Sequence, residues 1–273
     1  MNELEAKQKG LSEELGRMPS LVVAYSGGVD SAYLAYAAHQ VLGERMLAVT
    51  ALSASYAQRD RQEAEGMVAR FKFPHEFIET VELSDPNYRA NNPDRCYFCK
   101  DAMFVRLEEL AAQRGFAAIA YGINVDDKGD WRPGQRAAQK HQIMTPLLDA
   151  GLTKADIREL ARRADLPVWD RPASACLSSR LAYGLEVTPE RLAVVEKGEE
   201  ALRGLGFHQM RVRHHDQMVR IEIAPDELPQ ALTPDMARKF VEIFKALGFR
   251  FVALDLEGYR TGSLNIHLVD LKK

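Results

Sequence analysis

Short apolar runs alternate with amphipathic stretches from the start of the chain to about residue 165. The apolar runs, rich in β-favouring side chains, are residues 21–25, 46–51, 77–81, 117–122 and 143–148. The stretches with helical spacing are residues 3–15, 29–38, 58–70, 102–114 and 153–160. Strands that alternate with helices predict an α/β fold, in which a parallel sheet carries helices on both faces.

The pattern changes after about residue 185. Helices are expected over residues 188–205 and 233–247, because a Thr-Pro pair begins each of them. Alternating runs at residues 210–214, 219–223 and 251–256 predict three strands. The length of 273 residues suits two domains. We therefore expect an α/β domain over residues 1–185 and a smaller α+β domain over residues 186–273.

Composition and charge narrow the possible functions. The chain has 36 Lys and Arg against 39 Asp and Glu, so it lacks the basic footprint of nucleic-acid-binding proteins. No apolar run approaches the roughly 18 residues of a membrane helix, and the N-terminus does not resemble a signal peptide. We therefore expect a cytoplasmic protein. In that reducing compartment, its three cysteines favour metal or catalytic use over disulfides.

The first apolar run leads into a glycine turn that predicts phosphate binding. Residues 26–31 read Ser-Gly-Gly-Val-Asp-Ser, without the ending of a Walker A loop or the spacing of a dinucleotide fingerprint. Glycines let the backbone approach a ligand, and a helix N-terminus attracts an anion. The segment resembles the PP-loop of ATP pyrophosphatases, which split ATP between its α- and β-phosphates. The residues expected to bind ATP are Ser26, Gly27, Gly28, Asp30 and Ser31, and Asp30 is also expected to be catalytic.

Ligands of parallel sheets lie beyond the carboxyl ends of the strands. Residues 50–55 should therefore border the adenine or the ribose. Gly122, which ends the fourth apolar run, is also expected to bind the nucleotide, and Asp126 and Asp127 follow it. Their carboxylates are candidates to hold Mg²⁺ on the departing pyrophosphate, and a solvated loop is the alternative. Residues 131–136 are expected to form a further loop, with arginines able to bind phosphate.

The three cysteines lie in two segments. Cys96 and Cys99 form a C-x-x-C pair at the start of an expected helix, and Cys176 lies near Arg180 in an irregular stretch. The pair alone is compatible with half a zinc site, a redox pair or two packed thiols. If Cys176 folds back towards them, three thiolates can hold a [4Fe–4S] cluster with one iron open to an anion such as sulfide.

Four segments together resemble the LarE family: the PP-loop, residues 122–127 with 131–134, residues 175–180 and residues 254–262. The resemblance implies an ATP-dependent sulfur transferase of nickel-pincer nucleotide biosynthesis. Such an enzyme adenylates a carboxylate of pyridinium-3,5-biscarboxylic acid mononucleotide and replaces its oxygen with sulfur. In the branch that sacrifices its own cysteine, that cysteine lies one place earlier, where this chain has Ala175. The chain resembles the other branch, in which Cys96, Cys99 and a catalytic Cys176 would hold the cluster.

The same resemblance implies a substrate site in the second domain. The residues expected to bind the substrate are Arg180, Glu199, Arg211, Arg213, Glu222 and Arg260. Strand periodicity puts Arg211 and Arg213 on one face, and the resemblance places them at the substrate phosphate. His214 and His215 are expected at the surface. Family members are commonly oligomers, so a homo-oligomer is expected, with the second domain contributing to it.

Three other hypotheses stay open. A tRNA thiolation enzyme combines a similar loop with a similar set of cysteines, but usually adds zinc-binding cysteines or a basic RNA-binding domain, and this sequence shows neither. An amide-forming PP-loop ligase would need no such cysteines. A nucleotide-binding iron–sulfur sensor would not catalyse a reaction at all. The sequence does not indicate which donor would reload the sulfur.

Overall fold

The structure is a computed structural model that describes residues 2–128, 133–172, 174–260 and 263–265. These residues form two compact units. The first comprises the chain up to Glu82 together with Cys96–Ser174, and the second comprises Leu83–Arg95 and the chain from Ala175 onward. The ranges 1–185 and 186–273 stay a prediction about domains. Among the described residues, no helix is both long and apolar enough to cross a bilayer.

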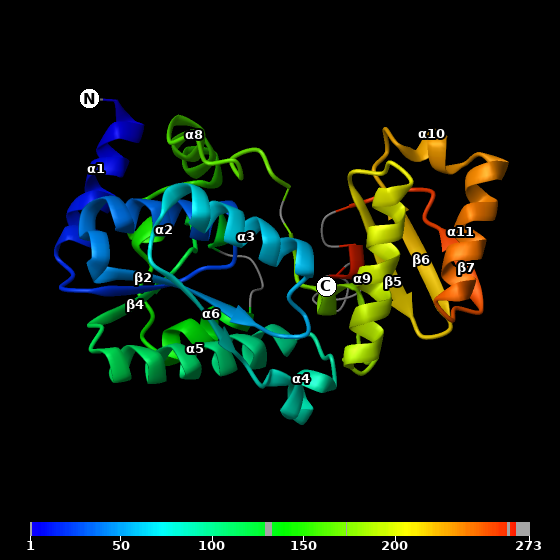
Figure 1. Cartoon of the computed structure of the whole chain (residues 1–273), viewed down its shortest axis with the longest axis horizontal. Helices are drawn as coiled ribbons and strands as arrows, with labels where there is room; N and C mark the ends of the chain where they lie inside the picture. Colours follow the sequence, from blue (N-terminus) through cyan, green and yellow to red (C-terminus); the bar gives the residue numbers. More distant parts are fainter. Residues whose placement is uncertain (1, 129–132, 173, 261–262, 266–273) are drawn as a thin grey trace. The chain divides into compact units, whose positions relative to one another are not determined.

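The first unit is built on a parallel sheet with the strand order β3-β2-β1-β4, which confirms the predicted α/β class (Figure 1). Its strands are β1 (Leu21–Ala24), β2 (Met46–Leu52), β3 (His75–Glu79) and β4 (Ala118–Tyr121). Its helices are α1 (Glu3–Gly16), α2 (Val29–Leu42), α3 (Gln58–Phe71), α5 (Arg95–Arg114), α6 (Pro133–Lys140), α7 (Pro146–Asp149) and α8 (Lys154–Arg163).

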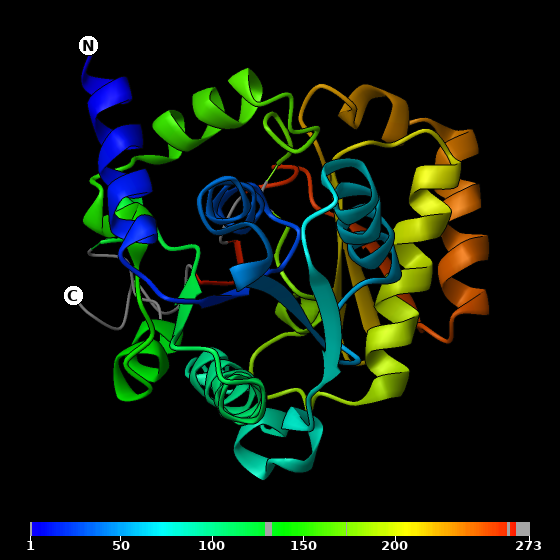
Figure 2. The same ribbon diagram turned by 60° about the vertical axis from the view of Figure 1, so that its left-hand side comes forward.

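Strand β1 explains why helices cover both faces of this sheet. Leu21 and Val23 pack with α1, α2 and α8, whereas Val22 and Ala24 pack with α5 and α6. All four side chains are buried, so the strand is a continuous apolar run rather than an alternating one. Figures 1 and 2 show α2 and α3 on one side of the sheet and α5 on the other.

Three sequence expectations for this unit are wrong. Residues 143–148 are not a strand, because Met144 makes only an isolated bridge with Ala120 and Pro146 begins α7. Pro133 likewise begins a helix where a loop was expected. Proline lacks the N–H of a strand ladder, and its fixed φ suits the first turn of a helix. Strand β3 lies two residues earlier than expected; Trp131 and Arg132 lie outside the described residues.

The second unit is an α+β fold, as predicted. Its strands β5 (Met210–His215), β6 (Met218–Ile223) and β7 (Phe251–Leu254) form a sheet in that order, antiparallel and then parallel. Its helices are α4 (Pro86–Arg89), α9 (Pro189–Gly204), α10 (Leu228–Ala231) and α11 (Pro234–Ala246). Thr188 and Thr233 cap α9 and α11, which confirms both predicted starts. The short helices α4 and α10 were not predicted.

Packing of this unit depends on one glycine and buries one histidine. A Cβ on Gly198 of α9 would lie 2.8 Å from the ring of Phe244, so only glycine lets α9 lie this close to α11. His214 of β5 is 7% exposed and packs edge-on against Phe249, with ring centroids 4.8 Å apart. The expectation that His214 lies at the surface is therefore wrong, because β5 turns that side chain into the core. His215 is half-buried.

Candidate functional site

The turn between β1 and α2 is held by hydrogen bonds among the serines of the PP-loop. The amide of Ser26 donates to Oγ of Ser31 at 3.1 Å, and that hydroxyl donates to the carbonyl of Gly28 at 3.0 Å. Gly28 is the N-cap residue of α2 and has no side chain to cover the helix end. Amides in the first turn of α2 can therefore face an anion.

Two glycines at this turn are required by its geometry. Gly27 has a φ of +78°, a left-handed backbone conformation that favours glycine and would be strained with any larger side chain. Gly122, at the end of β4, approaches the backbone of α2. A Cβ there would lie 2.7 Å from the amide nitrogen of Ser31 and 2.9 Å from the carbonyl carbon of Asp30. Both positions exclude a larger residue without movement of the loop.

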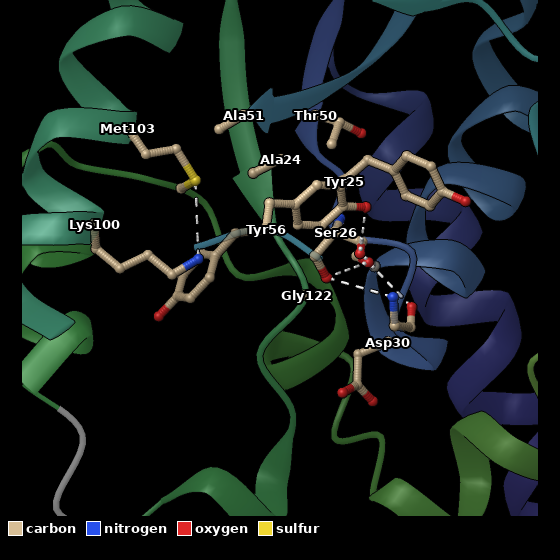
Figure 3. Close-up of a pocket in the computed structure, with 13 residues that line it drawn as sticks. Ala24, Tyr25, Ser26, Asp30, Thr50, Ala51, Tyr56, Lys100, Met103 and Gly122 are labelled. Carbon is tan, nitrogen blue, oxygen red and sulfur yellow. Dashed lines mark hydrogen bonds between the residues drawn. The ribbon is translucent and has the colours of Figure 1, made fainter. Parts of the chain in front are cut away.

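A pocket of about 140 Å³ opens beside this turn (Figure 3). Its wall includes Ser26, Gly28, Asp30, Ser31 and Gly122, together with Thr50 and Ala51 from β2 and Tyr56, Lys100, Met103 and Tyr121. The pocket therefore combines the phosphate-type turn with an apolar side suited to a base. Figure 3 shows Lys100 and Met103 across the pocket from Ser26 and Asp30. That residues 50–55 border the adenine or ribose stays a prediction.

Asp30 is held from two sides. Its Oδ2 accepts from the ammonium of Lys154 at 2.6 Å, and its Oδ1 accepts from the side-chain amide of Asn124 at 3.4 Å. The other two candidate carboxylates, Asp126 and Asp127, accept hydrogen bonds from backbone amides. Asp126 accepts from the Lys154 amide at 2.7 Å, and the buried Asp127 accepts from the Asn124 amide at 3.1 Å. Their expected roles toward ATP and Mg²⁺ stay predictions.

The cysteines are divided between the units. Cys96 is exposed and Cys99 is half-exposed, and both lie near the start of α5, as predicted. Cys176 is exposed and is the N-cap residue of a 3-10 helix, Leu177–Arg180, in the second unit. The described residues contain no cluster of three metal-ligating side chains. The convergence of the three thiols therefore stays a prediction.

A buried ion pair fixes the main chain around Cys176. Arg180 donates to Oε1 of Glu199 at 2.9 Å, and both side chains are no more than 4% exposed. The same guanidinium donates to the carbonyl of Cys176 at 2.8 Å and also to that of Ala175. Burial alone would raise the pKa of Glu199, but the charge and hydrogen bond of Arg180, the Arg211 charge and the Val212 amide together hold this pKa below its usual value.

A second buried ion pair lies on β5 and β6. Arg213 contacts Glu222 at 2.9 Å, and Glu222 also accepts from Arg220 at 3.0 Å and from Ser263 at 2.7 Å. Arg213 further donates to the carbonyl of Ser179 at 3.0 Å. Arg213 is therefore a buried side chain with fixed protein partners rather than a solvent-facing one.

The remaining candidate arginines are less buried. Arg211 is half-buried, and its guanidinium lies over the ring of Tyr259 at 4.9 Å. Arg260 pairs with Asp255 at 3.7 Å and with Glu257 at 2.7 Å; Thr261 and Gly262 lie outside the described residues. Burial lowers the pKa of Arg211, and the neighbouring Arg180 charge lowers it further. Cations crowded in this way favour the binding of an anion. The substrate roles of all six residues stay predictions.

No family model matches the chain, whereas individual proteins do. A protein of Lactiplantibacillus plantarum named pyridinium-3,5-bisthiocarboxylic acid mononucleotide synthase, a LarE protein, is 34% identical over 97% of this chain and 96% of its own. The chain belongs to the LarE family. An uncharacterized protein of Synechocystis is 39% identical over 96% of this chain and 98% of its own.

More distant relatives place the LarE chain in the PP-loop superfamily. A glutamine-hydrolyzing GMP synthase chain of Thermococcus kodakarensis is 27% identical over 72% of the LarE chain and 67% of its own. The tRNA-specific 2-thiouridylase MnmA of Rickettsia felis is 28% identical over 58% of the LarE chain and 53% of its own. These relatives are ATP-using PP-loop enzymes, and the LarE chain is an enzyme of the same superfamily.

Sequence reasoning assigned no role to several residues around the site of this LarE chain. Tyr56 lines the pocket one residue beyond the segment expected to border the nucleotide, and Lys100 lines it one residue after Cys99. Lys154 was recognised only as part of the predicted helix over residues 153–160. Its neighbour Thr153 forms a capping box with Asp156 at the start of that helix. Tyr56 and Lys100 could have been predicted only from their position, because each directly follows a segment that had been recognised.

Proposed function

We propose that this chain is an ATP-dependent sulfur transferase that converts a carboxylate of pyridinium-3,5-biscarboxylic acid mononucleotide into a thiocarboxylate. The observation that carries the proposal is the near full-length similarity to the named bisthiocarboxylic acid mononucleotide synthase. A PP-loop beside a pocket and a buried arginine network in the second unit agree with it. The substrate's phosphate and carboxylate groups are anions that such arginines can bind.

In the first step, a substrate carboxylate oxygen attacks the α-phosphorus of ATP, and the bond to the bridging oxygen of the β-phosphate breaks. Pyrophosphate leaves, and the substrate becomes an acyl adenylate. The loop residues Ser26, Gly27 and Gly28 and the amides of the first turn of α2 would stabilise the charge that develops on the pyrophosphate. Asp30 and Asp127 are the carboxylates proposed to hold Mg²⁺, which when bound neutralises the phosphates.

In the second step, sulfur adds to the acyl carbon, the bond to AMP breaks, and the product is a thiocarboxylate plus AMP. Cys96, Cys99 and Cys176 would hold a [4Fe–4S] cluster, which when bound supplies a sulfide ligand. The donor set fits, because all three thiols are at least partly exposed and Cys96 and Cys99 lie one helical turn apart.

Contacts within the second unit support the proposed convergence of the cysteines. Arg95 directly precedes Cys96, and its guanidinium donates to the carbonyl of Ser178 at 2.9 Å. Ser178 lies two residues after Cys176, and its hydroxyl also hydrogen-bonds that of Tyr88 at 2.7 Å. The chain before Cys96 is therefore tied to the chain after Cys176 by buried hydrogen bonds.

The test is an anaerobic reaction of the reconstituted chain with MgATP and the biscarboxylic acid mononucleotide. Pyrophosphate, AMP and the sulfur-containing product are measured by enzyme-coupled assay and mass spectrometry, and iron and sulfide are counted beforehand. Cys176→Ala should retain adenylation and pyrophosphate release within about twofold while losing sulfur transfer, because the thiol is proposed to act only in the second step. Sulfur transfer that persists in Cys176→Ala would refute the role of that thiol.

A tRNA thiolation enzyme is the alternative to exclude. The thiouridylase relative matches only 58% of the chain, and the net charge of −3 provides no basic surface for RNA. Unmodified tRNA therefore serves as a second acceptor in the same assay. Thiolated tRNA, without conversion of the mononucleotide, would overturn the proposal.

A further inference from the structure

The segment that carries the chain out of the first unit is fastened to the helix behind the PP-loop. We define it as the exit segment, residues 169–172 with Ser174. It follows α8 and has no helix or strand of its own among its described residues. Two residues after Ser174 comes Cys176, so chain geometry keeps their Cα atoms within about 7 Å of each other. Whatever holds the exit segment therefore also restricts Cys176.

The fastening is a clamp of charged side chains on α3. Arg171 contacts Oδ1 of Asp60 at 2.5 Å and also pairs with Glu63, and these three side chains are 16–29% exposed. Ser174 donates to both carboxylate oxygens of Asp60, at 3.3 and 3.2 Å. Asp60 therefore binds the exit segment both before Pro172, through Arg171, and after it, through Ser174.

The other side of the exit segment is held by α8. Arg158 donates to the carbonyls of Trp169 and Arg171, at 2.6 and 2.7 Å. These bonds replace the backbone partners that an irregular segment lacks. Arg171 is therefore fixed through its main chain by α8 and through its side chain by α3.

The same turn of α3 also contacts the PP-loop. The hydroxyl of Tyr56 lies 3.1 Å from the carbonyl of Ser26 and 3.2 Å from the carbonyl of Asp60, so it bridges the two. The place of a Cβ on Gly27 is 3.6 Å from that Asp60 carbonyl. Asp60 thus lies against the phosphate turn through its main chain and against the exit segment through its side chain.

We infer that Arg171 and Asp60 are positioning residues, which fix the exit segment, two residues before Cys176, on the helix that contacts the PP-loop. This inference rests on the proposed function. The clamp would thereby restrict where Cys176 can reach, and sulfur delivery to the acyl adenylate depends on that restriction. Its loss should leave adenylation intact but let the adenylate hydrolyse before sulfur reaches it, because small misplacements of reacting groups slow a reaction by about 10- to 100-fold.

The test measures pyrophosphate and thiocarboxylate in the same reaction for Arg171→Met. We expect pyrophosphate release within about twofold of wild type, thiocarboxylate formation reduced about 10-fold or more, and the missing product recovered as AMP and unchanged acid. Arg171→Lys, which keeps the charge, should recover part of the coupling. Arg70→Met is the matched control, since Arg70 also joins α3 to the chain after α8, through Asp165, but is 49% exposed.

A double-mutant cycle with Asp60→Asn should show that the second change adds little to the uncoupling caused by Arg171→Met. Equal loss of pyrophosphate release and thiocarboxylate together with a lower Tm would mean a merely structural role and overturn the inference. Unchanged coupling in Arg171→Met, or the same uncoupling in Arg70→Met, would also overturn it. If wild type itself forms no thiocarboxylate, the proposed function has failed instead.

Discussion

Replacing Gly122 with alanine tests whether the close approach of β4 to α2 shapes the phosphate turn. The added Cβ would lie 2.7 Å from the Ser31 amide nitrogen and 2.9 Å from the Asp30 carbonyl carbon, both backbone atoms that no rotamer change can move. Overpacking of this kind costs about 1–3 kcal/mol. The strain falls on two residues in the first turn of α2, so the turn must shift to relieve it.

We therefore expect Gly122→Ala to unfold at lower urea concentration and to raise the KM for ATP in the pyrophosphate-release assay. The control is Gly66→Ala on the exposed face of α3, where a Cβ meets nothing within 4 Å. There the loss of backbone entropy in the unfolded chain should stabilise the protein by about 0.5–1 kcal/mol. If Gly122→Ala is as stable and as active as Gly66→Ala, the close approach does not shape the site.

Two further predictions concern charge. Lys154→Met leaves the Asp30 carboxylate without its ammonium partner, so it should raise the KM for ATP about fivefold, worth about 1 kcal/mol; an unchanged KM in steady-state pyrophosphate release would contradict this. Burial lowers the pKa of His75 from 6.5 to about 4, so the unfolded chain binds more protons between these values, and stability falls as the pH is lowered through that window. Because the ring is half-buried, the wild type should lose about 1 kcal/mol of unfolding free energy in this window. Urea unfolding at pH 7 and pH 5 should show that His75→Asn loses less unfolding free energy between these two pH values than the wild type does.

Local signals predicted much of the fold. The apolar run of β1 and the glycine turn after it form the predicted strand, turn and helix, because each depends on neighbours in sequence. The caps at Thr153, Thr188 and Thr233 are local for the same reason. The run at 143–148 misled because apolar character alone does not separate a strand from a buried helix, and its proline decided the outcome.

The interactions that build the site could not be predicted in this way. The ion pair between Lys154 and Asp30 joins residues 124 positions apart, and the clamp from Arg171 to Asp60 joins residues 111 apart. Strand periodicity predicted that Arg211 and Arg213 lie on one face of β5, but it did not predict how deeply each side chain is buried. Arg213 is buried because β6 brings Glu222 against it, and that pairing depends on the register of two strands.

The two arginines that flank Cys176 do related work from different units. Arg171 binds α3 in the first unit, and Arg180 binds Glu199 of α9 in the second while donating to the Cys176 carbonyl. Both fix main chain and leave the thiol exposed. If Cys176 acts on an acyl adenylate as proposed, this arrangement favours the reaction, since a fixed backbone lowers the entropy lost on approach while the side chain stays accessible. Loss of Arg171, which has no expected role in substrate binding, should therefore affect sulfur transfer more than adenylation.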